Sequence, residues 1–345
     1  MTKILRISRR NQEKSEIEAA AEILRNGGLV AFPTETVYGL GADALNPRAV
    51  KKIFEAKGRP SDNPLIVHIG NKKEIYKLAR EIPEETERLM EKFWPGPLTL
   101  VLKKSKAVPK VTTGGLDTVA IRMPKHRIAL SLIKKSKVPI AAPSANLFSR
   151  PSPTLAEHVI EDLHGKIEAI IDGGKTKIGV ESTVLDLTTD PPTLLRPGGI
   201  TLEELEEFLG EVKVHPALKG KKIKKMDFKS PGMKYKHYAP NANVIVVEGD
   251  CRNVKKKVQQ LADKYRKEAK KVAVMTTDKN HSYKADLIKF VGREFNAIAK
   301  NLFKTYREFD EEKANIIIVE GVENKGLGFA IMNRLKKASC KTIKV

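Results

Sequence analysis

Short apolar strands and amphipathic helices follow one another along most of this chain, and the pattern fails in one place, between residues 218 and 240. That stretch is rich in lysine, contains proline and glycine and has few apolar residues, which is typical of a solvated linker. A chain of 345 residues is also long for one average domain and suits two. We therefore predict a larger domain over residues 1–212, a basic linker over 213–241 and a smaller domain over 242–345.

The larger domain mixes strands and helices without strict alternation. The pattern predicts helices over 15–26, 49–56 and 72–93, and strands over 29–32, 65–69, 98–102, 118–122, 138–141, 167–171, 182–186 and 193–196. This mixture indicates an α/β domain built around a mixed, twisted sheet.

The pattern restarts cleanly after the linker. Strands are predicted over 244–247, 272–275 and 315–319, and helices over 252–269, 293–307 and 327–337. Strands that alternate with helices in this way indicate βαβ units, so we expect a small, Rossmann-like, three-layer α/β domain.

Cysteine content and charge limit the class of protein. Cys251 and Cys340 are far apart and lack His or Cys neighbours at ligand spacing, which argues against a disulfide framework and a zinc site and favours a reducing cytoplasm. No apolar run is long enough to cross a membrane. The net charge of +22 lies mostly beyond residue 212. This charge has two possible explanations. It either attracts polyanions such as tRNA, or it reflects a lysine-rich surface of the kind found in thermophilic proteins.

Two loops carry residues suited to an anionic ligand, and each also has an ordinary explanation. Lys57 and Arg59 flank Gly58, either as solvated cations beside a helix C-cap or as a point charge and a bidentate fork for phosphate or carboxylate. Ser144 and Asn146 form either a common turn or part of a nucleotide pocket. His68, in an apolar strand, is by itself more typical of a core residue, while Arg122 ends a strand. Open α/β sheets bind ligands beyond the carboxyl ends of their strands.

Two other segments resemble known phosphate loops only superficially. Residues 172–176 (DGGKT) lack the first glycine of a P-loop, because Ala169 stands at that position. Residues 39–41 (GLG) begin a dinucleotide fingerprint, but Ala44 replaces its third glycine. Any nucleotide site in this chain is therefore built differently.

Taken together, the loops resemble those of the YrdC-type threonylcarbamoyl-AMP synthases in their long, two-domain form. The motifs are PTETVYGL at 33–40, KGRP at 57–60, NPL at 63–65, WPGPLT at 94–99, RMP at 122–124, PSAN at 143–146 and ESTV at 181–184. Residues 230–240 (SPGMKYKHYAP) and 326–335 (GLGFAIMNRL) are similar to the linker and tail of that form. The resemblance identifies 1–212 as a YrdC-like catalytic domain.

The resemblance implies an enzyme, an L-threonylcarbamoyladenylate synthase of the nucleotidyltransferase class. Such enzymes make threonylcarbamoyl-AMP and pyrophosphate from L-threonine, bicarbonate or CO2, and ATP. A downstream transferase complex then modifies tRNA next to the anticodon, so contact of this chain with tRNA is expected to be indirect. Mg²⁺ is expected with ATP, with no metal site made by the protein.

The resemblance also assigns roles to individual residues. The catalytic cations would be Lys57 and Arg59. The residues implied for ATP are Lys57, Arg59, Asn63, Ser144, Asn146, Ser152, Arg196 and Tyr238. Those implied for L-threonine are Thr34, His68, Thr118, Arg122, Ala142 and Ser182, with Arg122 on the carboxylate. The linker residues Tyr235, Lys236, His237 and Tyr238 would form a lid over the active site.

Two alternatives stay open at this point. The charge also fits a non-catalytic RNA-binding protein, although aromatic residues make up only 6% of the chain and no aromatic RNA platform is visible. A carbamoyl-adenylate enzyme of hydrogenase maturation would need cysteine-rich modules that this chain lacks. For the smaller domain we expect a regulatory or docking role, because it carries no phosphate fingerprint.

Overall fold

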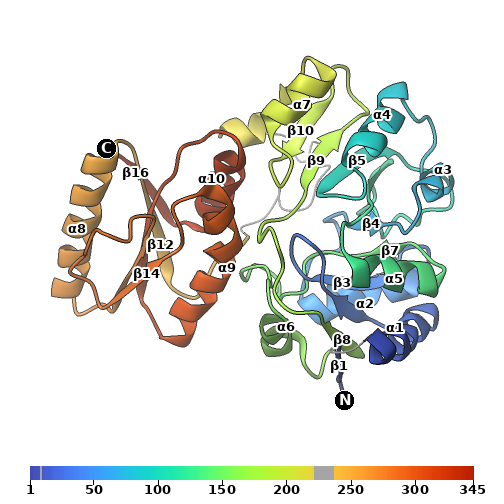
Figure 1. Cartoon of the computed structure of the whole chain (residues 1–345), viewed down its shortest axis with the longest axis horizontal. Helices are drawn as coiled ribbons and strands as arrows, with labels where there is room; N and C mark the ends of the chain where they lie inside the picture. The colour runs from blue at the N-terminus through green and yellow to red at the C-terminus, as the bar shows by residue number, and fades with distance from the viewer. Residues whose placement is uncertain (8–9, 221–236) are drawn as a thin grey trace. The chain divides into compact units, whose positions relative to one another are not determined.

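The computed structural model describes the backbone of residues 1–7, 10–220 and 237–345 and, except at 10–13, their side chains. The chain forms two compact units (Figure 1). The first unit consists of the described residues of Met1–Phe148 and of residues 152–220. The second consists of Ser149–Pro151 and residues 237–345. Residues 149–151 lie inside the predicted first domain, yet they pack with the second unit.

The first unit is built on a mixed sheet whose strand order is far from the order in the chain. From edge to edge the strands are β1 (Lys3–Arg6), β8 (Ala169–Asp172), β2 (Val30–Phe32), β3 (Gly39–Asp43), β7 (Ile140–Ala141), β4 (Ile66–His68), β6 (Thr118–Arg122), β5 (Leu98–Lys103), β9 (Thr183–Asp186), β10 (Thr193–Arg196) and β11 (Lys213–Val214). Parallel pairs such as β4–β6 and β5–β9 alternate with antiparallel pairs such as β5–β6. The prediction of a mixed α/β sheet is confirmed.

Helices pack against this sheet through apolar faces. They are α1 (Arg10–Arg25), α2 (Pro47–Lys57), η1 (Lys72–Glu74), α3 (Ile75–Leu78), α4 (Glu84–Phe93), α5 (Arg127–Ser136), α6 (Ala156–Leu163), α7 (Leu202–Leu209) and η2 (Pro216–Lys219). One core joins Leu24 of α1 and Leu132 of α5 to Ile171 of β8. A second lies over the middle strands and includes Val101 and Val184.

The helix predicted over 72–93 is wrong in one respect, because it is broken between Ala79 and Pro83. Ala79 is extended and forms a bridge with Lys104, and Glu81 has a positive φ of 52°. Pro83 then stands just before the first turn of α4, where its missing N–H costs no hydrogen bond. The amphipathic pattern continued across the break, so periodicity alone did not reveal it.

The second unit is a fully parallel sheet in the order β14 (Leu287–Phe290), β13 (Val272–Thr276), β15 (Ile316–Glu320), β12 (Asn243–Glu248) and β16 (Lys341–Lys344). Helix α8 (Cys251–Lys267) covers one face, while α9 (Phe295–Glu311) and α10 (Leu327–Ala338) pack together on the other (Figure 1). The Rossmann-like prediction is therefore confirmed. The edge strands β14 and β16 were not predicted, because half-exposed strands lack a continuous apolar run.

Candidate active site

Strand pairing brings two of the predicted residues together. In the parallel pair β4–β6, His68 and Arg122 occupy paired positions at the carboxyl ends of their strands. Burial, and after it the charge of the Arg122 guanidinium, lower the pKa of His68 to about 3, so the two side chains interact electrostatically. His68 is therefore neutral at physiological pH and able to donate or accept a hydrogen bond. Its Nδ1 has no hydrogen-bond partner among the described residues.

The turn between β2 and β3 is closed by Thr34. Its Oγ1 donates to the carbonyl of Val37 at 2.7 Å and accepts from the backbone N–H of Thr36 at 3.1 Å. This arrangement is an ST-turn, in which a side chain takes the place of a backbone group. It leaves Glu35, at the middle of the turn, with a buried side chain.

Glu35 and Arg122 form a buried ion pair, with 2.8 Å between Oε2 and Nη2. Arg122 also donates from Nε to the carbonyl of Gly96 at 3.3 Å. The family resemblance assigns no role to Glu35, although it stands in the first motif. Sequence reasoning missed Glu35, although an acidic residue in a turn directly after a buried strand could have indicated it.

Lys57 ends α2, followed by Gly58 in the left-handed conformation at φ 61°. The C-cap part of the ordinary explanation is thus correct, but the solvated-cation part is wrong because Lys57 is buried. Its Nζ donates to the carbonyl of Ser144 at 2.6 Å and to the carbonyl of Asn146. The two loops singled out in the sequence therefore meet at this lysine.

Arg59 is buried as well, and its Nη2 donates to the carbonyls of Asn63 at 3.3 Å and Pro64 at 3.1 Å. These bonds close residues 59–64 into a compact loop. The Nδ2 of Asn63 is buried without a hydrogen-bond partner in the described part of the chain. A buried donor of this kind is available to a ligand.

A fourth buried cation, Arg196 at the end of β10, is held by Ser182. Arg196 donates to the Ser182 carbonyl from Nε at 3.0 Å and contacts the Ser182 Oγ from Nη2 at 3.1 Å. The same hydroxyl lies 2.7 Å from Thr99 Oγ1. Arg196 also contributes to lowering the pKa of His68, so it belongs to the same electrostatic environment as Arg122.

Three further predicted residues, Ser152, Ala142 and Thr118, make other contacts or lie at another strand end. The Ser152 hydroxyl donates to Glu181 Oε1 at 2.6 Å, and Ala142 donates its N–H to the carbonyl of Ile66 at 2.9 Å. Thr118 begins β6, at the opposite end of the strand from Arg122. At about 3.3 Å per residue, its Cα is roughly 13 Å from that of Arg122. The strand therefore does not bring Thr118 together with Arg122.

Two of the four predicted lid residues, Tyr235 and Lys236, lie outside the described residues. His237 and Tyr238 are buried. Tyr238 has a positive φ of 67° and stacks on Phe303 of α9, with 5.4 Å between ring centroids. The Arg334 guanidinium carbon lies 5.4 Å from the Tyr238 ring centroid. Within the second unit, these contacts fix the orientation of the Tyr238 ring.

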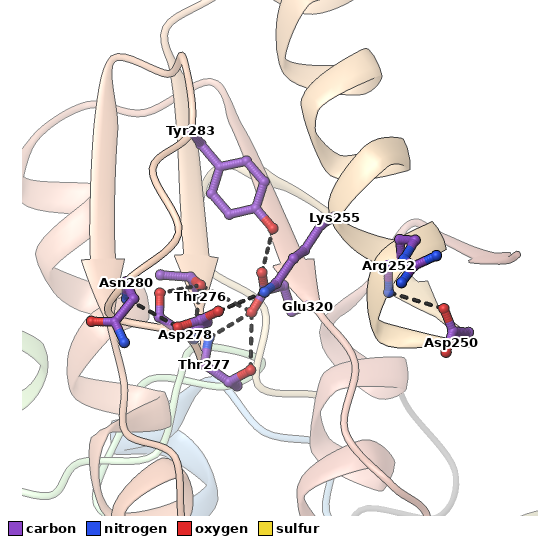
Figure 2. Close-up of polar contacts among 9 residues, drawn as sticks. All are labelled: Asp250, Arg252, Lys255, Thr276, Thr277, Asp278, Asn280, Tyr283 and Glu320. Atoms are coloured by element: carbon purple, nitrogen blue, oxygen red, sulfur yellow. Dashed lines mark hydrogen bonds and ion pairs between the residues drawn. The ribbon is translucent and has the colours of Figure 1, made fainter.

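A separate polar cluster lies at the carboxyl ends of β13 and β15 (Figure 2). Glu320 Oε2 accepts from Thr276 Oγ1 at 3.0 Å, from Thr277 N–H at 2.6 Å and from Thr277 Oγ1 at 3.0 Å. Its Oε1 accepts from the Tyr283 hydroxyl, and the neighbouring ion pair joins Lys255 to Asp278 at 2.5 Å. Because the carboxylate is satisfied internally, this cluster stabilises the second unit.

Comparison with known proteins establishes the family. A model described as telomere recombination matches residues 22–198, and a model described as the C-terminal domain of threonylcarbamoyl-AMP synthase matches residues 200–340. A threonylcarbamoyl-AMP synthase of Pyrococcus abyssi is 58% identical over 339 residues, 98% of each chain. The chain belongs to the threonylcarbamoyl-AMP synthase family. It is an enzyme of that family, and its assignment from the motifs is confirmed.

A second relative and a solved structure agree with this assignment. A threonylcarbamoyl-AMP synthase of Bacillus subtilis is 51% identical over 328 residues, covering 94% of this chain and 93% of its own. A crystal structure of the Pyrococcus abyssi Sua5 protein complexed with L-threonine has a TM-score of 0.94 at 57% identity. It covers 100% of this chain and 99% of that one.

The described residues also bear on metal binding and on membrane insertion. Within them, no group of three or more His, Cys, Asp or Glu side chains is arranged to hold a metal ion. Over the same ranges, no helix is both long enough and apolar enough to cross a membrane.

Proposed function

We propose that this enzyme combines L-threonine, bicarbonate or CO2, and ATP into threonylcarbamoyl-AMP and pyrophosphate. The threonine amine adds to the carbon of CO2 and gives a carbamate. A carbamate oxygen then attacks the α-phosphorus of ATP, and pyrophosphate leaves with the electron pair of the broken P–O bond. No step needs a nucleophilic side chain, because substrate oxygen and nitrogen atoms form every new bond.

The observation that carries this proposal is the burial of four cations in one unit. Exposure is 2% for Lys57, 7% for Arg59, 4% for Arg122 and 5% for Arg196. Carbamate, triphosphate and pyrophosphate are all anionic, and fixed cations in a site of low dielectric stabilise charge that builds up in the transition state. The family assignment supports the same reaction.

We divide the site by the chemistry of its residues. The ATP side would be formed by Lys57, Arg59, Asn63, Ser144, Asn146, Ser152 and Arg196. The threonine side would be formed by Thr34, His68, Arg122, Ala142 and Ser182, without Thr118, which lies at the far end of β6. Neutral His68 suits the threonine hydroxyl, and Arg122 suits its carboxylate. The L-threonine complex of the Pyrococcus abyssi relative supports threonine as the amino acid.

Mg²⁺ would bind with ATP. Because no acidic cluster suited to a metal is found in the described ranges, the triphosphate and water would supply most of its ligands. The ion would neutralise phosphate charge and assist the departure of pyrophosphate.

The product would pass to a downstream complex that transfers the threonylcarbamoyl group to tRNA beside the anticodon, in the cytoplasm. On this proposal tRNA need not touch the enzyme itself. The concentration of positive charge beyond residue 212 has an independent explanation as a lysine-rich surface.

Pyrophosphate release from ATP and bicarbonate tests the proposal when measured with and without L-threonine. We expect release to depend on threonine, and the nucleotide product to carry the mass of threonylcarbamoyl-AMP. Valine should be rejected by about 100-fold or more, because polar groups that meet the threonine hydroxyl would be left unpaired. Release that ignores threonine, together with tight RNA binding, would favour the non-catalytic alternative. Chelation of Mg²⁺ should stop turnover and leave threonine binding intact.

A further inference from the structure

Glu35 is held in place by its backbone as well as by its side chain. Its carbonyl accepts from the N–H of Ile178 at 2.8 Å, and the Thr34 hydroxyl closes the turn on its other side. The side chain is 4% exposed. The carboxylate therefore has a defined position in the first unit, beside the strand ends that carry His68 and Arg122.

Both oxygens of this carboxylate are buried and accept no hydrogen bond from any described residue. Oε2 lies 2.8 Å from Arg122 Nη2 in the ion pair, which leaves Oε1 as the oxygen available to a ligand. A buried acceptor without a partner costs about 1–3 kcal/mol. Native proteins usually satisfy such atoms, so a retained one is explained well by a partner that arrives with a ligand.

Several polar atoms near Glu35 also have no hydrogen-bond partner among the described residues. The Arg122 guanidinium carries five N–H groups, and its contacts in the described structure are with Gly96 and Glu35. His68 Nδ1 and His126 Nδ1 likewise have no partner there. The region around the ion pair can therefore accept a polar ligand that brings both donors and acceptors.

An amino acid matches this arrangement in charge. Its carboxylate is complementary to the guanidinium, and its ammonium group is complementary to the carboxylate. Two opposite charges taken into a buried site are tolerated when each meets a partner of the other sign. A buried Arg–Glu pair provides both partners at once, 2.8 Å apart in the ligand-free protein.

We propose that Glu35 receives the ammonium group of the amino-acid substrate through Oε1 and accepts the proton that the nitrogen loses before it attacks CO2. This inference rests on the proposed function and adds a residue to it. Arg122 would meanwhile hold the substrate carboxylate.

The proton balance is simple. An N–H bond of the ammonium breaks, an O–H bond forms on Glu35, and a neutral amine remains. The nitrogen lone pair forms the N–C bond as one C=O electron pair moves to oxygen, and a second proton leaves the nitrogen to water, which yields the carbamate. Protonation also removes the charge of Glu35 from Arg122, so that the guanidinium attracts the substrate carboxylate more strongly.

The test compares two ligands and three proteins. The ligands are L-threonine and 2,3-dihydroxybutanoate, which replaces the amine by a hydroxyl. The proteins are the wild type, Glu35→Gln and the matched control Glu168→Gln, whose carboxylate accepts a structural hydrogen bond from Leu29 N–H at 2.7 Å. Calorimetry gives the affinities, and pyrophosphate release at saturating threonine gives kcat.

We expect the wild type and Glu168→Gln to bind threonine about 30-fold more tightly than the analogue, as removal of a charged hydrogen bond implies. Glu35→Gln should bind the two ligands within about threefold of each other. Its kcat should fall by about 100-fold or more, the usual contribution of a positioned general base. Glu35→Asp should recover part of both losses.

The outcomes separate this inference from the proposed function. Wild-type enzyme that releases pyrophosphate without threonine contradicts the proposed function. An active wild type whose preference for threonine over the analogue survives in Glu35→Gln overturns the role of Glu35 alone. If Glu35→Gln does not fold, the wild type still decides, because equal affinity for the two ligands would also overturn the inference.

Discussion

Lys57 Nζ donates a hydrogen bond to the carbonyl of Ser144 at 2.6 Å, and this contact joins the end of α2 to the loop after β7. The same ammonium reaches the carbonyl of Asn146. In a buried environment of low dielectric, the charge of an ammonium group acts strongly on a nearby anionic ligand. The contact therefore both shapes the two loops and points the charge at their junction.

Substitution of Lys57 by methionine should abolish most of the activity. The side chain keeps its length but loses its charge, and removal of one group that stabilises developing charge typically lowers kcat by about 100-fold or more. The control is Lys52→Met in the same helix, whose Nζ contacts the carbonyl of Gly27 at 2.7 Å. Threonine-dependent pyrophosphate release should fall only in Lys57→Met. Equal losses in both variants would mean that helix α2, and not the charge, is what matters.

Arg196→Lys should not be a conservative change. The guanidinium contacts both the carbonyl and the hydroxyl of Ser182, a geometry that a single ammonium does not reproduce. We expect the KM for ATP or threonine to rise by about tenfold or more, with kcat reduced as well. Steady-state kinetics with each substrate varied in turn would measure this. Wild-type constants in the variant would remove Arg196 from the site.

Buried His68 predicts a loss of stability in acid. Its pKa is about 3 in the folded protein and about 6.5 when unfolded, so between these values the unfolded state binds more protons. Stability from this group is therefore complete above pH 6.5 and declines as the pH falls toward 3. At pH 5 the loss is about 2 kcal/mol relative to pH 7.5.

His68→Gln should remove this part of the pH dependence, whereas the exposed His164→Gln should retain it. Urea unfolding at pH 7.5 and pH 5.0, followed by a probe in the first unit, gives the free energies to compare. Parallel behaviour of the wild type and His68→Gln would show that His68 is not held neutral by the fold.

Glu320→Gln should weaken the second unit. The buried carboxylate accepts hydrogen bonds from two threonines and Tyr283, and an amide can accept at only one of its two positions (Figure 2). We expect the free energy of unfolding to fall by about 1–3 kcal/mol for the unsatisfied groups. The exposed Glu323→Gln serves as the control. Denaturant midpoints that coincide for both variants would contradict a structural role for this cluster.

Much of the fold followed from local pattern. The strands at 65–69 and 118–122, and the helices that cover the parallel sheet of the second unit, have strong periodicity, because each buries one face or both. The motif loops also identified the family, since turn residues such as Gly58 are constrained by local backbone geometry. Information of this kind lies within a few consecutive residues, so the chain alone reveals it.

Only the tertiary structure determined which partners the side chains of these loops contact and how deeply they are buried. Three contacts join residues that are distant in sequence: the ion pair of Glu35 with Arg122, the hydrogen bond from Lys57 to the Ser144 carbonyl, and the hydrogen bond from Arg196 to the Ser182 carbonyl. Whether a lysine is solvated or buried depends on what the fold places over it, and no local pattern encodes that. The break at residues 79–83 and the edge strands β14 and β16 were missed for the same reason, because long-range pairing outweighed local preference there.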